Sequence, residues 1–244
     1  MVGPVPYLCA SDSPFANQTY TYFYLENCED HLFNVPGVTA SNGGITSVVF
    51  GPSIHDSVDC DDGVVDGSGL MGDSFFSQSP SITFTFNAAV LGSLPTRVGI
   101  VWTDGGANSA VTFRARDGAG TLLGTIAATH GDSSNNGTTA EDRFHGAIFA
   151  GGIGSITISN TSGGIEVDHL QYAGEATQAC DAIDFNGDGL FPDTADIDDF
   201  LSVFSGGPCS TGTCGDIDFN NDGLFPDTAD IDSLLSVFSG GACL

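Results

Sequence analysis

The chain has 244 residues, enough for one domain of ordinary size and a second, small one. It carries 31 acidic residues against four arginines and no lysine, so its formal net charge is −27. This charge excludes nucleic acid and anionic membrane surfaces as partners, because both require a basic footprint. No apolar run approaches the roughly 20 residues of a membrane-spanning helix, so we expect no membrane insertion. Cations, and calcium above all, are the ligands that such a chain attracts.

Residues 1–175 are expected to form a mainly β domain, a sandwich or jelly roll. Short runs of alternating apolar residues recur between clusters of Gly, Asn, Asp and Ser, a pattern typical of such folds. Alternation groups Trp102 with Val98 and Ile100, so we expect this side chain in the core. Tyr20, Tyr22 and Tyr24 would stack on sugar rings if they are exposed. The predicted strands lie at 20–25, 44–50, 82–86, 98–102, 111–115, 121–127, 143–150, 153–158 and 165–172.

The β domain resembles two kinds of secreted protein. The strand pattern is similar to that of jelly-roll carbohydrate-binding modules, in which the first and last strands often share a structural calcium ion. This resemblance makes Glu26 or Asp30, together with Asp168, a candidate third calcium site; the alternative is a solvated acidic face. Residues 98–104, 111–117 and 163–169 also resemble secreted β-sandwich proteins of uncharacterised function, a resemblance that implies no particular activity.

Cysteine usage favours an oxidising compartment, and hence secretion. Cys28 and Cys60 lie in acidic stretches and are predicted to pair, which leaves Cys9 free or available for an intermolecular bond.

Catalysis is not expected. The stretch Gly72-Asp73-Ser74 is similar to the nucleophile motif of one esterase family, but the later Asp-x-x-His of that family is missing. The five histidines show no metal-binding spacing.

Residues 180–244 contain a repeat with a period of 34 residues. Placing 184–209 over 218–243 matches 22 of 26 positions. The segment 180–244 holds 13 Asp and no basic residue, so its self-repulsion would oppose folding unless cations bind. A short polar linker, 175–178, precedes the segment.

Each repeat opens with Asp-Phe-Asn-x-Asp-Gly, which places oxygen ligands at positions 1, 3 and 5 of an EF-hand-like loop and Gly at position 6. Position 7 binds calcium through its main-chain carbonyl. Position 12 is Ala195 or Ala229, and the closing carboxylate comes one residue later, so the loop has thirteen residues. The Asp at position 10 is an alternative ligand, directly or through water. The predicted ligands are Asp184, Asn186, Asp188, Leu190, Asp193 and Asp196, and Asp218, Asn220, Asp222, Leu224, Asp227 and Asp230.

A helix is predicted after each loop, because Ile197, Phe200, Leu201 and Phe204 fall at helical spacing, as do their equivalents 34 residues later. A loop with an exiting helix and no entering helix, present twice, resembles a dockerin; the flanking cysteines resemble the tails of secreted planctomycete-type proteins. The resemblance implies a cohesin-like or surface-anchoring partner, contacted by loop positions 10 and 11. Those positions are Asp193 and Thr194, and Asp227 and Thr228.

Dockerin geometry, with two antiparallel helices, implies disulfides from Cys180 to Cys243 and from Cys209 to Cys214. The alternative pairs each repeat internally, Cys180 with Cys209 and Cys214 with Cys243.

The expectation is therefore a secreted or cell-surface calcium-binding protein. Its dockerin-like tail, 180–244, would anchor a β-sandwich recognition domain, 1–175, that binds glycan. The alternative is a structural component of an extracellular matrix or surface assembly that does not bind glycan.

Overall fold

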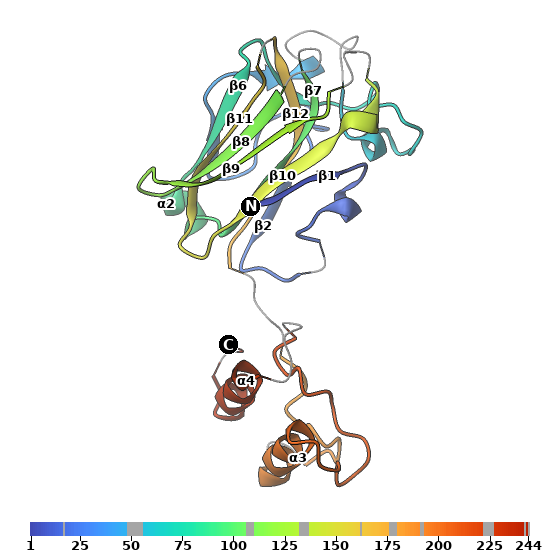
Figure 1. The fold of residues 1–244 in the computed structure, drawn as a ribbon, viewed down its shortest axis with the longest axis vertical. Coiled ribbons are helices and arrows are strands. Elements are labelled where there is room, and N and C mark those ends of the chain that lie inside the picture. Colours follow the sequence, from blue (N-terminus) through green and yellow to red (C-terminus); the bar gives the residue numbers. More distant parts are fainter. Residues whose placement is uncertain are drawn as a thin grey trace. The chain divides into compact units, whose positions relative to one another are not determined.

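The computed structural model describes residues 1–16, 18–47, 56–105, 110–131, 137–161, 163–175, 180–190, 193–221, 227–241 and 243. The chain folds as two compact units, Met1–Glu175 and Ala176–Leu244. Figure 1 shows strands in the first unit and two helices in the second.

The first unit is a sandwich of two antiparallel sheets. In the seven-stranded sheet the order is β1 (Val2–Pro6), β10 (Arg143–Ile148), β7 (Arg97–Gly105), β12 (Ile165–Ala173), β5 (Phe75–Ser77) and β4 (Gly44–Ile45), and β2 (Phe23–Glu26) also pairs with β12. The five-stranded sheet has the order β3 (Val38–Ala40), β6 (Ser81–Phe86), β11 (Ile153–Ser159), β8 (Ala110–Asp117) and β9 (Leu122–Thr129). Short helical turns lie at η1 (Ala10–Asp12), η2 (Asp59–Asp62), α2 (Ala88–Leu91) and η3 (Thr139–Glu141).

Alternating burial along the strands explains the sandwich. In β8, Val111, Phe113 and Ala115 are fully buried, while the residues between them face outward. The same alternation runs through β6 and β11, so the five-stranded sheet has one apolar face. That face packs on the seven-stranded sheet, and Trp102 of β7 lies fully buried in the resulting core, as predicted. Its indole Nε1 donates to Asn160 Oδ1 at 2.7 Å, which satisfies the one polar atom of the ring.

Strand β12 is central to the seven-stranded sheet, and its register with β7 shifts in two places. Along one edge it pairs with β7, and along the other it pairs first with β5, through 165–167, and then with β2, through 170–173. Its register with β7 shifts between Asp168 and Gln171, and His169 has a φ of +43°. This bulge lies in the gap between β5 and β2, so two successive residues escape the usual alternation of side chains.

The second unit has two helices of equal length, α3 (Thr194–Phe204) and α4 (Thr228–Phe238). The phenylalanine at loop position 2 of each repeat packs against them: the rings of Phe185 and Phe200 are 5.1 Å apart, and those of Phe200 and Phe219 are 6.0 Å apart. Two disulfides, Cys180 to Cys243 and Cys209 to Cys214, close this small unit, as predicted. So small a core gains stability from these covalent links.

Two histidines of the β domain lie in an apolar environment. His145 Nε2 and His130 Nε2 are 3.1 Å apart, His130 packs edge-on against Trp102, and His145 packs against Phe113. Burial lowers the pKa of His145 to about 3 and that of His130 to about 4. Both rings are therefore neutral in the folded protein at neutral pH.

Protonation of this pair should weaken folding in acid. The unfolded chain takes up protons as pH falls through about 6.5, whereas the folded chain resists until about pH 4 and below, so the free energy of unfolding should fall between those values. A His145→Gln variant should show a shallower fall, because Gln keeps a polar partner for His130 but does not titrate. Urea titrations at a series of pH values measure both slopes. Equal slopes in the two proteins would show that protonation of His130 and His145 does not cause the fall in stability.

Candidate functional site

The first predicted calcium loop of the tail, which begins at Asp184, folds around its own oxygen atoms. Asp184 accepts hydrogen bonds from the main-chain N–H groups of Asp188, at 3.0 Å, and Gly189, at 2.9 Å. Asn186 Oδ1 accepts a second bond from Asp188 N, at 3.0 Å. Gly189, at position 6, has a φ of +78°, a conformation that glycine adopts without strain and that turns the chain sharply. The side chains at positions 1 and 3 are thus held on the inside of one turn.

The closing position is Asp196, the thirteenth residue of the loop. Its side chain is 0% exposed, and its carboxylate accepts bonds from Asn186 N, at 3.4 Å, and Asp193 N, at 3.2 Å. In the second repeat Asp230 is equally buried and accepts from Asn220 N, at 3.4 Å, and Asp227 N, at 3.1 Å. Both carboxylates therefore face the start of their own loop. Asn186 and Asp196 are buried whereas Asp188 is exposed, and an oxygen-only set of this kind fits calcium.

The aspartates at loop position 10, Asp193 and Asp227, also cap the helices that follow them. Asp193 Oδ1 accepts from Ala195 N at 2.7 Å, and Asp227 Oδ1 accepts from Ala229 N at 2.7 Å, so both cap the helices that follow. Thr194 and Thr228, the first residues of those helices, are exposed in both repeats. Leu190 is exposed and its N–H donates to Asp188. The predicted ligands Asp222 and Leu224 lie outside the described residues.

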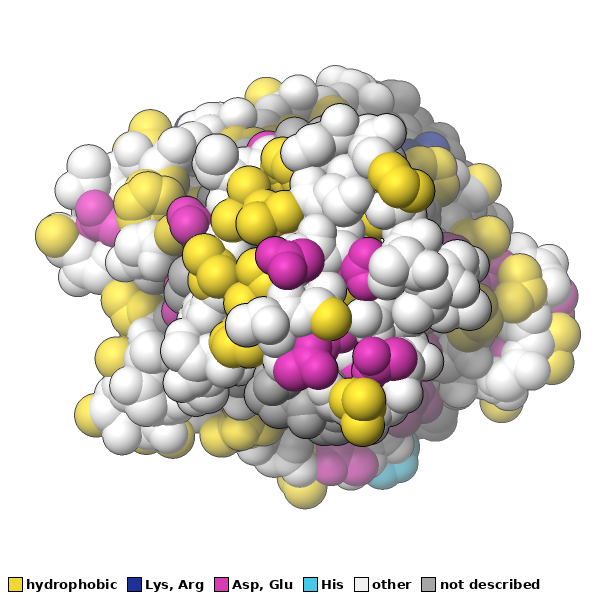
Figure 2. Space-filling model, turned by 90° about the horizontal axis from the view of Figure 1, so that it is seen from below, with side chains coloured by type: hydrophobic (Ala, Val, Ile, Leu, Met, Phe, Trp, Pro, Cys, Tyr) yellow, Lys and Arg dark blue, Asp and Glu magenta, His cyan; other side chains and the backbone are white. Residues whose placement is uncertain are grey.

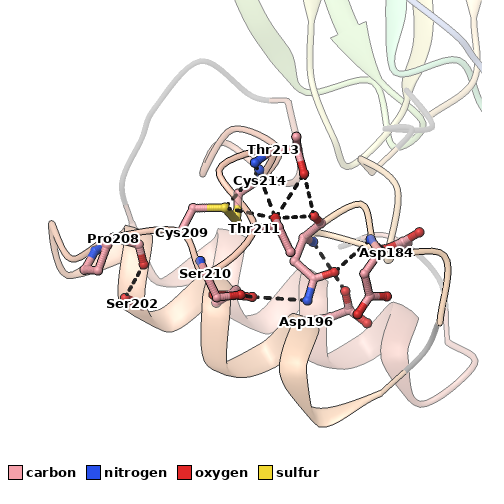
Figure 3. The surroundings of a disulfide bond; sticks show 12 residues. Asp184, Asp196, Ser202, Pro208, Cys209, Ser210, Thr211, Thr213 and Cys214 are labelled. Carbon is pink, nitrogen blue, oxygen red and sulfur yellow. Dashed lines mark hydrogen bonds between the residues drawn. A yellow bond between two sulfur atoms is a disulfide. The ribbon is translucent and has the colours of Figure 1, made fainter.

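A corner closed by the Cys209 to Cys214 disulfide supports the first loop (Figure 3). Thr211 and Thr213 lie between the two cysteines, and both hydroxyls donate to the main-chain oxygen of Asn186, at 2.6 and 2.9 Å. Sequence reasoning missed these threonines because they lie between the repeats. The hydroxyl of Ser210 donates to Asp199 at 2.6 Å, and Asp199 also accepts from Asn186 Nδ2. The second repeat has Ser233 in place of Asp199.

Of the predicted third calcium site, Glu26 and Asp168 line one small pocket, but the carboxylates of the predicted residues already accept other hydrogen bonds. Glu26 accepts from the main-chain N–H groups of Cys28, Asn34 and Val35, so its carboxylate shapes a turn. Asp30 is bonded to Leu32 and Asn34 at the surface. Asp168 instead accepts from Val58 N, at 3.0 Å, and His169 N, at 2.7 Å. Among the described residues, Asp168 shares a possible metal-binding group only with Asp61 and His169.

The predicted Cys28 to Cys60 disulfide is wrong. Cys60 bonds to Cys9, which links η2 to the N-terminal segment, and Cys60 N donates to Leu8 O at 3.0 Å. Cys28 is a free, buried thiol in the main core, and burial raises its pKa well above the ordinary value. Shared acidic surroundings suggested the Cys28 pairing, but pairing depends on which Cα atoms the fold brings together.

A pocket of the β domain combines aromatic and amide groups. Its volume is about 410 Å³, and Tyr20, Phe23, Gln18 and Gln171 are among the residues that line it. The rings of Tyr20 and Phe23 stack at 5.8 Å with an interplanar angle of 20°, and Phe23 is 42% exposed. The guanidinium of Arg97 lies 5.4 Å from the Tyr20 ring centroid and holds that ring in place. A flat, partly exposed apolar surface beside amides suits the C–H face and hydroxyls of a sugar.

The esterase-like motif does not present a nucleophile. Ser74 is fully buried and its hydroxyl donates to Glu166, while the neighbouring Asp73 bonds to His31.

The surface in Figure 2 carries acidic side chains among hydrophobic and neutral ones, with scarcely any basic side chain in view. No described helix is long and apolar enough to cross a membrane.

Comparison with known proteins gives only distant structural neighbours. No known family model matches the sequence, and no curated protein is significantly similar to it. TmCBM61, solved in complex with β-1,4-galactotriose, is 13% identical over 61% of this chain and 94% of its own, with a TM-score of 0.33. CsCBM6-3 from Clostridium stercorarium, in complex with cellobiose, is 18% identical over 65% and 99%, with a TM-score of 0.32. The K2 cleaved adhesin domain of Lys-gingipain is 11% identical over 62% and 99%, with a TM-score of 0.34. Scores this low assign neither a ligand nor a family.

Replacing the two closing aspartates should weaken calcium binding by the tail. In the full chain, Asp196→Asn with Asp230→Asn should lower the calcium affinity of the module on the order of 100-fold, because affinity follows the charge and number of ligands. Helix formation, followed by far-ultraviolet circular dichroism, should then need correspondingly more calcium.

The matched control is Asp198→Asn with Asp232→Asn, which removes the same charge from exposed positions on the same two helices. The control should titrate like the wild type. Equal losses in the two double variants would show that overall charge, and not the closing ligand, sets the affinity.

Proposed function

We propose that the chain is a secreted or cell-surface calcium-binding protein whose dockerin-like tail anchors a glycan-binding β-sandwich. The observation that carries this proposal is the pair of equivalent loops, each closed by a fully buried aspartate, Asp196 or Asp230. No lysine or arginine occurs in residues 180–244, so calcium is the counter-charge that these loops require. Three disulfides suit an oxidising compartment.

Docking would use the exposed starts of the two helices. Thr194 and Thr228 are exposed, and each follows an aspartate that is fixed as a helix cap. The two surfaces have the same residues in the same local conformation, so a cohesin-like or surface-anchoring partner could bind either one. Calcium would act by fixing the loop and the helix start together, since Asp196 and Asp230 also complete the capping boxes.

Glycan recognition is assigned to the pocket beside Tyr20 and Phe23. Stacked rings give a sugar an apolar platform, and the amides of Gln18 and Gln171 give its hydroxyls partners. The net charge of −27 opposes binding of acidic polysaccharides, so the expected ligand is a neutral polysaccharide. This role is binding and involves no catalytic step.

Loss of the aromatic platform should weaken glycan binding. The full chain should be retained by at least one of cellulose, xylan and galactan in affinity electrophoresis, and Phe23→Ala should reduce that retention about tenfold or more. Leu122→Ala is the matched control, because Leu122 is a similarly exposed apolar residue on the five-stranded sheet.

Retention that is unchanged in Phe23→Ala would place the glycan site elsewhere. No retention of the wild type on any of the three polysaccharides would favour a structural surface component.

A further inference from the structure

Asn186, the ligand predicted at position 3 of the first tail loop, is held through its main chain and its side chain alike. Its main-chain oxygen accepts the hydroxyls of Thr211 and Thr213, at 2.6 and 2.9 Å. Its Nδ2 donates to Asp199 Oδ2 at 3.1 Å, and its Oδ1 accepts from Asp188 N at 3.0 Å. The residue is 1% exposed. Asn186 therefore cannot turn without breaking several of these bonds.

Asp199 decides which way the Asn186 amide faces. A carboxylate only accepts hydrogen bonds, so the amide nitrogen points to Asp199 and Oδ1 points to the inside of the loop. Calcium binds oxygen, and an amide turned the other way would present its hydrogens to the ion. Ser210 holds Asp199 in its turn, through its hydroxyl at 2.6 Å and its main-chain N–H at 2.9 Å.

The corner that carries these groups, residues 209–214, is closed covalently. The disulfide joins Cys209 and Cys214, which are five positions apart, and both threonines lie between them. Figure 3 shows this corner beside the loop that begins at Asp184 and closes at Asp196. So short a covalent ring has few conformations, so the two hydroxyls reach the loop at a small cost in entropy.

The second loop has an equivalent neighbour, the segment that leads to Asp181. Gly215 N, directly after the corner, donates to Phe185 O of the first loop at 2.8 Å. The same bond occurs 34 residues away on each side, where Asp181 N donates to Phe219 O at 2.9 Å. Residue by residue, the segment before Asp181 therefore corresponds to the corner.

The side chains at the equivalent positions cannot repeat the same bonds. Alanine has no hydroxyl in any conformation, which holds for residues 176–179 although they lie outside the described ranges. A serine hydroxyl can donate as well as accept, so Ser233 suits either orientation of the Asn220 amide. Thr177 alone keeps the hydroxyl of its equivalent, Thr211. The equivalents of Cys209, Ser210, Thr213 and Asp199 are Glu175, Ala176, Ala179 and Ser233.

We propose that the two calcium sites of the tail are unequal, and that the first loop binds calcium more tightly and fills first because the corner pre-organises Asn186. This inference rests on calcium binding by both loops, which is part of the proposed function. Rigid sites bind calcium more tightly, since less order has to be imposed when the ion enters.

Unequal sites would give the two docking surfaces different calcium thresholds. Asp196 closes the first loop and also completes the capping box of α3, whose first residue is Thr194. Asp230 does the same for α4, whose first residue is Thr228. A rising calcium concentration therefore fixes the Thr194 surface first. Between the two affinities the partner would dock through α3, and the choice of a second orientation would open only at higher calcium.

Calcium titration of the full chain tests the inequality. After chelation and dialysis, the wild type should bind two ions to the tail in isothermal titration, with affinities at least about tenfold apart. Asp196→Asn should weaken the tighter step and Asp230→Asn the weaker one, which assigns each step to its loop.

Loss of the threonine hydroxyls should act on one loop only. Thr211→Val with Thr213→Val keeps the shape of both side chains but removes both donors, so the tighter step should weaken by about 10- to 100-fold while the weaker step stays unchanged. Thr211→Ser with Thr213→Ser keeps the donors and should restore most of the tight binding. An unchanged weaker step also shows that the module is folded, because phenylalanines of both loops share one core.

Asp199→Ser, which places the residue of the second repeat in the first, should weaken the tighter step as well. Its matched control is Asp198→Ser, because that change removes the same charge from a neighbouring position that is exposed. The control should titrate like the wild type.

Two indistinguishable sites in the wild type would overturn this inference and leave calcium binding by the tail intact. The inference would also fail if Asp230→Asn weakened the tighter step, or if the valine variant weakened both steps alike. A wild type whose tail binds no calcium would contradict the proposed function itself, and the inequality with it.

Discussion

The whole structure depends on how buried negative charge is neutralised in a chain that has 31 acidic residues and four arginines. Ion pairs with Lys or Arg are scarce by composition, so the carboxylates use other partners. Asp59 accepts main-chain N–H groups from Asp66 and Gly67 and the hydroxyl of Thr139, and Glu26 accepts three main-chain N–H groups. Main-chain N–H groups thus stabilise these buried carboxylates, as basic side chains do in other proteins. Where they run out, as at Asp142, both carboxylate oxygens are buried without a hydrogen-bond partner.

Sequence patterns predicted the regular parts of this fold well. Alternation found β6, β8 and β11 because one face of each strand is buried, and the helical spacing found α3 and α4 for the same reason. It also found β7, although that strand is buried on both faces. The calcium ligands of the two loops stay a prediction, drawn from residues that are close together in the chain. Strands β1, β3 and β5 escaped, because they are short and carry no clear alternation.

Features that depend on distant contacts could not be predicted in this way. The Cys9 to Cys60 link spans 51 residues, and the Tyr7 to His169 bond spans 162, so only the folded topology reveals them. The β12 bulge left no signal in a strand that is buried throughout its length. The aromatic pocket is built from an irregular N-terminal segment. One chain of bonds, Ser13 to Gln171 to Tyr7 to His169, links that pocket to the buried carboxylates.

The central position of β12 also sets the order in which the β domain can form. It is the last strand of its domain in the chain, yet β7, β5 and β2 all pair with it. A growing chain therefore leaves β2 and one edge each of β5 and β7 unpaired until residues 165–173 have been made. Closing such distant contacts is slow, and open edges invite aggregation in the meantime. The high negative charge of the chain keeps neighbouring molecules apart during that interval. The acidity that destabilises the folded core therefore protects the partly folded domain from aggregation.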